Sequence, residues 1–169
     1  QKMNTDKFPA YVHAYISKVP EGNPIELLQL GIKESLASLA MVSEEKASQS
    51  YEVGKWSIKD IIQHLIDTER IFCYRALAIA RGESVKLPGY NHESYAVKAE
   101  ANSRSLKELM EEFRNLRQSS INMFNSFSSE MLSQKGEANG LEITADQLQY
   151  ILIGHELHHL QVIHEKYLS

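Results

Sequence analysis

Apolar side chains recur at helical spacing in four separate stretches of this chain. Residues 23–43, 56–82, 105–127 and 144–167 each place them three or four positions apart, as on one face of an α-helix. In the first stretch these positions are Leu27, Leu30, Leu36, Leu39 and Ala40. In the second, one broad face is formed by Ile61, Leu65, Phe72, Ala76 and Ile79 together with His64. The period-two alternation of strands is nearly absent. The pattern therefore predicts four long helices.

Each predicted helix begins with a recognisable start signal. Asn23 precedes a proline, which is favoured at the first helical position because it lacks the N–H that would go unpaired there. Ser57 is expected as the N-cap of the second helix, with Asp60 in its first turn. The last two starts have a hydroxyl residue followed three positions later by a side chain that can bond back to it, Ser105 with Glu108 and Thr144 with Gln147. We expect the helices to begin at these residues.

The segments between the helices define the architecture. A leader at 6–22 can form a short helix that begins near Pro9. Residues 83–102 show no steady period and are predicted as a loop long enough to cross the bundle, and a polar stretch with Gly136 and Gly140 precedes the last helix. We predict an all-α four-helix bundle with a short N-terminal helical leader and little or no sheet. We expect a single domain over 1–169 with its core at about 20–168.

Composition and charge narrow the functional classes. The 169 residues are 43% hydrophobic and carry a net charge of −4 without a basic stripe, which argues against a nucleic-acid partner. The chain has one cysteine, so neither an internal disulfide nor a multi-cysteine metal site can form. No apolar run is long enough to span a bilayer. The default location is therefore the cytoplasm, and secretion with removal of a signal is the alternative.

The stretch "GHELHHLQVIH" (154–164) contains the metalloprotease pattern H-E-x-x-H at His155, Glu156 and His159. His155 and His159 lie one helical turn apart and can share a cation. A peptidase of this type needs a third ligand further along the chain, and the candidate there, Glu165, lies on an unbroken helix that points it to another face. The strands that would hold a peptide beside the helix are also missing. The pattern is therefore interpreted as a metal site of another kind.

A third ligand from an upstream helix completes such a site. His64 lies in the middle of the second long helix, on the face that otherwise meets the core. Alone it would be interpreted as a hydrogen-bonded core residue. Together with His155 and His159 it predicts a centre of three imidazoles that keeps a position open, which is typical of reactive zinc sites.

The remaining histidines and the cysteine fit this centre less well. His158 is expected at its rim or as a partner of a ligand, and His164 is on the wrong face of the helix. His13 and His92 fall in the leader and in the loop, where surface positions are expected. Cys73 is half a turn out of phase with the ligand on its helix and is interpreted as a small core residue rather than a nucleophile.

Two acidic residues are candidates for catalysis, Asp67 and Glu156. Asp67 and its neighbour Thr68 follow His64 by one turn on the same face, so either side chain can reach the metal or orient a water; ordinary helix polarity explains them equally well. Glu156 is turned about 100° from His155. It is expected either to bond a histidine near the metal or to face solvent.

Three motifs resemble the DinB-like superfamily, which includes the YfiT-type and bacillithiol-transferase proteins. They are "GKWSIKDIIQHLIDTE" (54–69), "LPGYNHESYA" (87–96) and "ILIGHELHHLQVI" (151–163). The resemblance implies an up-down-down-up bundle with a divalent metal held by His64, His155 and His159. It also implies a homodimer. By ligand type, zinc or nickel suits three imidazoles best.

The resemblance identifies the site better than the reaction. Its first implication is a thiol S-transferase that joins a low-molecular-weight thiol to an electrophilic small molecule, since a metal can bind the thiol as thiolate. A metal-dependent hydrolase of a small substrate is the second, with Glu156 or Asp67 as general base. The third is a non-catalytic, stress-associated metal-binding dimer, in which a fourth protein group would occupy the metal's open coordination position.

Overall fold

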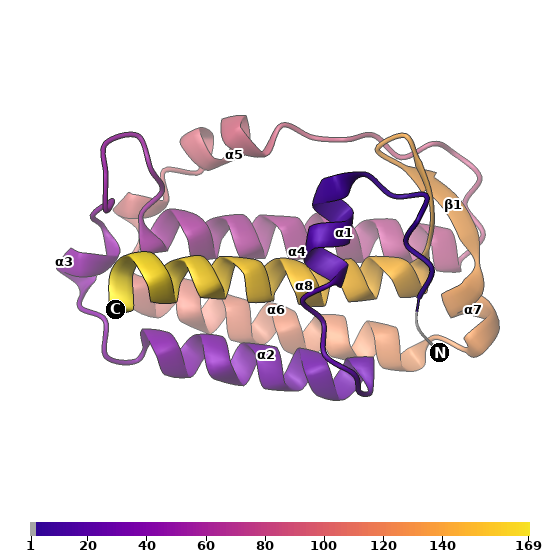
Figure 1. Ribbon diagram of the computed structural model, residues 1–169, viewed down its shortest axis with the longest axis horizontal. Helices are drawn as coiled ribbons and strands as arrows, with labels where there is room; N and C mark the ends of the chain where they lie inside the picture. Colours follow the sequence, from indigo (N-terminus) through magenta and orange to yellow (C-terminus); the bar gives the residue numbers. More distant parts are fainter. Residues whose placement is uncertain (1–2) are drawn as a thin grey trace.

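Four long helices that lie side by side dominate the computed structural model, which describes residues 3–169 (Figure 1). They are α2 (Pro24–Leu39), α4 (Ile58–Ala80), α6 (Leu106–Ser126) and α8 (Ala145–Ile163). Helices α2 and α8 run in one direction, and α4 and α6 run in the other (Figure 1). The predicted up-down-down-up four-helix bundle is confirmed.

The helix starts lie where the sequence places them. Asn23 accepts hydrogen bonds from the backbone N–H groups of Ile25 and Glu26. The capping pairs at the starts of α4, α6 and α8 are all formed, with each side chain bonded to the other residue's backbone. These bonds satisfy N–H groups that have no partner within the helix, which is why such local signals define a helix boundary.

Shorter helices fill the connections. They are α1 (Ala10–Ile16), α3 (Glu44–Ala47), α5 (His92–Ala99), a 3-10 turn (Ala101–Ser103), α7 (Ser129–Ser133) and a final π-helical turn (His164–Leu168). Helix α1 is the predicted leader. The expectation of an unbroken loop at 83–102 is wrong, because Asn91 caps α5 by accepting from the Ser94 N–H. The chain before α5 returns along the bundle, which allows α4 and α6 to run in parallel (Figure 1).

A small hairpin replaces the polar stretch before the last helix. Strands β1 (Lys135–Ala138) and β2 (Leu141–Thr144) pair antiparallel. The two residues between them, Asn139 and Gly140, both have positive φ, as the tight hairpin turn requires. This Asn-Gly pair was a sequence signal for a hairpin. Leu87 bonds the hairpin through its N–H to the Glu137 carbonyl and through its carbonyl to the Asn139 N–H, at 2.9 and 3.0 Å.

Two apolar clusters fill the bundle, and a polar layer lies between them. The first cluster includes Leu28, Ile79, Phe124, Leu148 and Ile151; the second includes Leu39, Ile62, Leu109, Phe113 and Ile163. The buried polar residues between them include His64, Glu69, Arg117, His155 and Glu156. Leu30 and Ala40, predicted on the apolar face of the first helix, are instead exposed. Within residues 3–169 no helix is long and apolar enough to cross a membrane.

Arg117 connects all four long helices within this polar layer. From α6 its Nε and Nη2 donate to the carboxylate of Glu69 on α4 at 2.7–3.1 Å. Its Nη1 donates at 2.9 Å both to Glu156 on α8 and to the Leu28 carbonyl on α2. The second oxygen of Glu156 accepts from Ser35 on α2 at 3.0 Å. Burial alone would lower the pKa of Arg117, but the two carboxylates outweigh it and raise that pKa.

Helix α1 packs against α8 at a glycine. A side chain at Gly154 would overlap the backbone carbonyl of Tyr15, at the end of α1. A glycine at this point therefore allows the two backbones to approach closely, at the cost of helix propensity.

We expect Gly154→Ala to displace α1 and to destabilise the protein by about 1–3 kcal/mol, the usual range for overpacking. The overlap is with backbone, so no side-chain rotation can relieve it, and it outweighs the helix propensity gained. Hydrogen exchange of the amides of residues 10–16, combined with chemical denaturation, measures both effects. Unchanged protection of these amides together with increased stability would contradict the prediction.

Candidate metal centre

Three histidines from two helices converge in the polar layer. His64 comes from α4, and His155 and His159 come from α8. One ring nitrogen from each lies within 4.8 Å of the other two. The Nε2 atoms of His64 and His155 are 3.0 Å apart, and the three ring centroids are separated by 4.6–4.9 Å.

Local helix geometry and the packing of α4 on α8 together produce this arrangement. His155 and His159 are one turn apart and project from the same side of α8. The apolar clusters above and below fix α4 against α8, which brings His64 to that side. His64 and His155 are buried and His159 is half-buried, so the group is reached from the side of His159.

Burial keeps these imidazoles neutral. It lowers the pKa of His64 to about 4 and, with the neighbouring histidines adding repulsion, that of His159 to about 3. The pKa of His155 is lowered well below its ordinary value for the same reasons. A neutral imidazole keeps a lone pair for a metal, so the three rings are in the protonation state that a ligand requires.

The donor set and its spacing fit one divalent transition metal. A cation bonded at about 2.0–2.1 Å keeps two nitrogens no more than about 4.2 Å apart, so the observed separations require only small side-chain adjustments. Within residues 3–169 no fourth histidine, cysteine or carboxylate joins this group. The geometry suits a metal with open positions.

Two aromatic side chains border the histidines. The Trp56 ring lies 4.8 Å from that of His64 and is stacked at 6.2 Å on that of His159. On another side the Tyr15 ring meets His155 edge-on at 5.2 Å. The sequence motif contained Trp56, but its place against two ligands was not predicted, because it depends on the packing of the α3–α4 connection.

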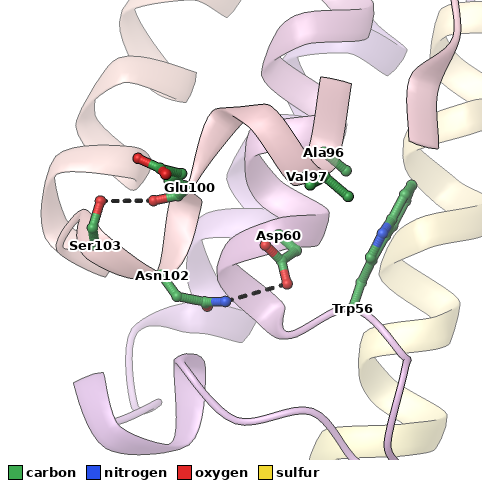
Figure 2. A pocket seen from close by; sticks show the side chains of 7 residues that line it. All are labelled: Trp56, Asp60, Ala96, Val97, Glu100, Asn102 and Ser103. Atoms are coloured by element: carbon green, nitrogen blue, oxygen red, sulfur yellow. Dashed lines mark hydrogen bonds between the residues drawn. The ribbon is translucent and has the colours of Figure 1, made fainter. Parts of the chain in front are cut away.

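A cavity of about 540 Å³ lies next to Trp56. Asp60 of α4, Ala96 and Val97 of α5, and Asn102 line it, and the Trp56 ring stands between these residues and α8 (Figure 2). Asn102 donates to the Asp60 carboxylate at 3.4 Å. Trp56 thus separates a surface cavity from the histidine group.

Asp67 and Thr68 follow His64 by about one turn of α4, and both are engaged with other groups. The half-buried Asp67 carboxylate accepts from Gln63 at 3.0 Å, and burial raises its pKa. Thr68 shares a hydrogen bond of 2.8 Å with the Tyr90 hydroxyl. Within residues 3–169 Asp67 does not belong to the group of converging ligand atoms.

Glu156 occupies a position that the sequence did not predict. It was expected either to bond a histidine or to face solvent, but it is only 3% exposed and bonds Arg117 and Ser35. A glutamate buried to this extent requires a cationic partner, and Arg117 provides it from α6. Both carboxylate oxygens are therefore engaged, one with α6 and one with α2, and Glu156 does not join the converging histidines.

The other candidate residues lie outside the group. His158 is half-buried against Tyr15 and His159, and His164 bonds Ser38 at 2.9 Å on the surface. His13 bonds Thr5 at 2.8 Å, and the exposed His92 has its ring 5.8 Å from that of His64. Cys73 bonds Ser120, and burial raises the pKa of its thiol to about 12.

Comparison with known proteins agrees with this fold. The chain is 25% identical over 124 residues to a proposed metal-dependent hydrolase of Oceanobacillus iheyensis, covering 70% of this chain and 69% of the relative. Its fold is similar to that of YfiT from Bacillus subtilis, described as a probable metal-dependent hydrolase with an unusual four-helix bundle topology. That comparison has a TM-score of 0.77 at 13% identity and covers 88% of this chain and 90% of that chain.

The fold also resembles a mycothiol-dependent maleylpyruvate isomerase, with a TM-score of 0.68 at 14% identity over 86% of this chain and 61% of that chain. A sequence model of the DinB superfamily matches residues 27–163, a span that contains all three converging histidines. Since this match covers well over half of its 169 residues, the chain belongs to the DinB superfamily.

Proposed function

We propose that this protein is a metal-dependent transferase that joins a low-molecular-weight thiol to an electrophilic small molecule. The observation that carries the proposal is the group of three neutral imidazoles, His64, His155 and His159, which no fourth protein ligand within residues 3–169 completes. A divalent cation held there, with zinc or nickel as the best candidates, would supply a positive charge that lowers the pKa of a thiol or water ligand.

The chain's own cysteine does not provide the thiol. Cys73 bonds Ser120 and Glu69 lies close by, and with its pKa raised to about 12 the thiol stays protonated at neutral pH. A thiol substrate must therefore come from outside. The similarity in fold to a mycothiol-dependent isomerase supports a thiol of low molecular weight.

The residues around the three imidazoles provide an environment that suits such a reaction. The imidazoles accept the cation without losing a proton first, and Trp56 and Tyr15 cover two sides of them with aromatic surface that limits the access of water. The half-buried Asp67, whose pKa is raised by burial, stands one turn after His64 as a candidate proton acceptor.

A metal-dependent hydrolase is the second candidate. It is favoured by the descriptions of the Oceanobacillus relative and of YfiT, and Asp67 would be its general base because Glu156 is bonded to Arg117. A purely structural metal site is less well supported, since such a site is normally closed by four protein ligands. A homodimer remains a prediction.

The test is conjugation of N-acetylcysteine to 1-chloro-2,4-dinitrobenzene. In this reaction a carbon–sulfur bond forms, the carbon–chlorine bond breaks, and chloride and the thiol proton are released. We expect the zinc- or nickel-loaded protein to accelerate it, the acceleration to disappear on chelation, and readdition of metal to restore it. His164→Ala, a surface histidine, is the matched control and should behave as the parent protein.

The same preparations are assayed for hydrolysis of p-nitrophenyl acetate. Metal-dependent ester hydrolysis without any thiol conjugation would favour the hydrolase. Conjugation at the same rate with and without metal would contradict the proposal.

A further inference from the structure

Arg75 is a buried cation for which residues 3–169 provide no anionic partner. It is 6% exposed, and no carboxylate lies within ion-pair distance of it. Other buried cations do have such partners: Lys59 pairs with Glu44 at 2.9 Å and Arg117 with Glu69 at 2.7 Å. Burying an unpaired charge is costly, so an uncompensated guanidinium indicates a missing anion.

The guanidinium has donors that remain available. Its Nη2 donates to the Pro88 carbonyl at 2.8 Å, and the group lies over the rings of Phe72 and Tyr90 at 5.5 and 5.9 Å. Within residues 3–169 no acceptor bonds Nε or Nη1. Since no side-chain nitrogen or oxygen in this part of the chain is both sealed from solvent and unbonded, these two nitrogens of Arg75 keep some contact with solvent.

Arg75 is on the same side of α4 as His64. The two residues are eleven positions apart, which is close to three full turns and about 16 Å along the helix axis. Thr68 lies between them on that side and bonds the hydroxyl of Tyr90, whose ring faces Arg75. The guanidinium and the metal-binding nitrogens therefore belong to one face of the bundle.

Tyrosines lie close to Arg75 on this face, and the Asp67 carboxylate lies near one of them, Tyr90. Burial lowers the pKa of Arg75, and Tyr90 and Tyr11 oppose this shift. Tyr15 belongs to the same group of tyrosines, because Tyr11 and Tyr90, together with burial, raise its pKa. Its ring also meets the ring of His155 edge-on. This face therefore carries tyrosine rings and, three turns from His64, a guanidinium that makes no ion pair within residues 3–169.

We propose that Arg75 binds a carboxylate of the substrate, so that the substrate is an anionic small molecule whose reacting end reaches His64, His155 and His159. An arginine fork matches a carboxylate in shape and charge, and charge-assisted bonds of this kind are the strong ones. The part of the substrate between its carboxylate and its reacting end spans on the order of 10–15 Å, given the spacing of Arg75 and His64 along α4. The proposal rests on the proposed function for the reacting end, but the anion site is tested without any reaction.

The alternative is that Arg75 only anchors the segment before α5. That segment has an independent anchor, because Leu87 makes two backbone hydrogen bonds to the β-hairpin next to Pro88. Arg75→Gln keeps a polar amide on a shorter side chain and removes the charge. Arg75→Lys keeps the charge and loses the fork.

The experiment measures binding of 3-phenylpropionate and of its neutral analogue 3-phenylpropan-1-ol by isothermal titration calorimetry. We expect the parent protein to prefer the carboxylate by about ten-fold or more, the effect of one hydrogen bond to a charged group. Arg75→Gln should lose that preference and keep its affinity for the alcohol, and Arg75→Lys should be intermediate. Arg114→Met, which removes an exposed arginine of α6, is the control and should match the parent.

Each titration is repeated after chelation of metal. A preference that persists in the metal-free protein and disappears in Arg75→Gln supports the anion site even if no thiol conjugation is found. A preference that disappears on chelation and survives in Arg75→Gln shows that the carboxylate binds the metal, and overturns the proposal. Equal binding of acid and alcohol by the parent protein also overturns it and requires no variant.

Discussion

His64→Ala is expected to lose nearly all bound metal while remaining helical. His64 is the one member of the group that α4 contributes, so its removal leaves two neighbouring imidazoles on α8. Loss of a residue that merely supports a ligand weakens metal binding by about 10–100-fold, so loss of the ligand itself should exceed that range. Thiol conjugation should fall in parallel.

The measurement is metal content by mass spectrometry after dialysis against equal free zinc, with competition by a chelator to give affinity. His159→Ala tests the same site at its more exposed position and is expected to show the same loss. His164→Ala carries a histidine replacement on the neighbouring turn, bonded only to Ser38, and should retain the full metal content. Undiminished metal in folded His64→Ala would remove this residue from the site.

Arg117→Met is expected to destabilise the protein by about 3–5 kcal/mol, the usual cost of removing one partner from a buried ion pair. The replacement leaves the carboxylates of Glu69 and Glu156 buried without a cation and frees the Leu28 carbonyl. The effect is large because Arg117 contacts all three of the other long helices.

Chemical denaturation at neutral pH measures this change, with Arg114→Met on the exposed face of α6 as the matched control. The triple variant Arg117→Met, Glu69→Gln, Glu156→Gln removes the uncompensated charges and should recover part of the loss. A difference of less than about 1 kcal/mol between Arg117→Met and Arg114→Met would show that the network contributes as little as a surface ion pair.

The network also connects the bundle to the candidate metal centre. Glu69 is on the helix of His64, and Glu156 directly follows His155. Arg117 therefore links α4 and α8, the two helices whose relative position brings the three ring nitrogens together. In this H-E-x-x-H sequence the two histidines belong to the converging group, and the glutamate bonds Arg117 of α6 and Ser35 of α2.

The sequence by itself predicted the long helices and the three histidines of the candidate site, although His64 was named only because the bundle was expected to bring its helix against the last one. Capping pairs such as Ser57 with Asp60 act within one turn, so the start of a helix can be read from a few neighbouring residues. The spacing of His155 and His159 places them on one side of α8 by helix geometry alone. The Asn139–Gly140 turn was equally local, and its hairpin could have been predicted.

Only the tertiary structure decided the partners of the buried charges. Glu156 and Arg117 are 39 positions apart, and Arg117 and Glu69 are 48 apart, so no local pattern distinguishes this buried glutamate from one on a solvated edge. The same holds for Trp56 against His64 and His159, and for Arg75 among tyrosines of α1 and of the segment before α5. A side chain's protonation, burial and free donors depend on which helices become its neighbours, and that is determined by the packing of the whole bundle.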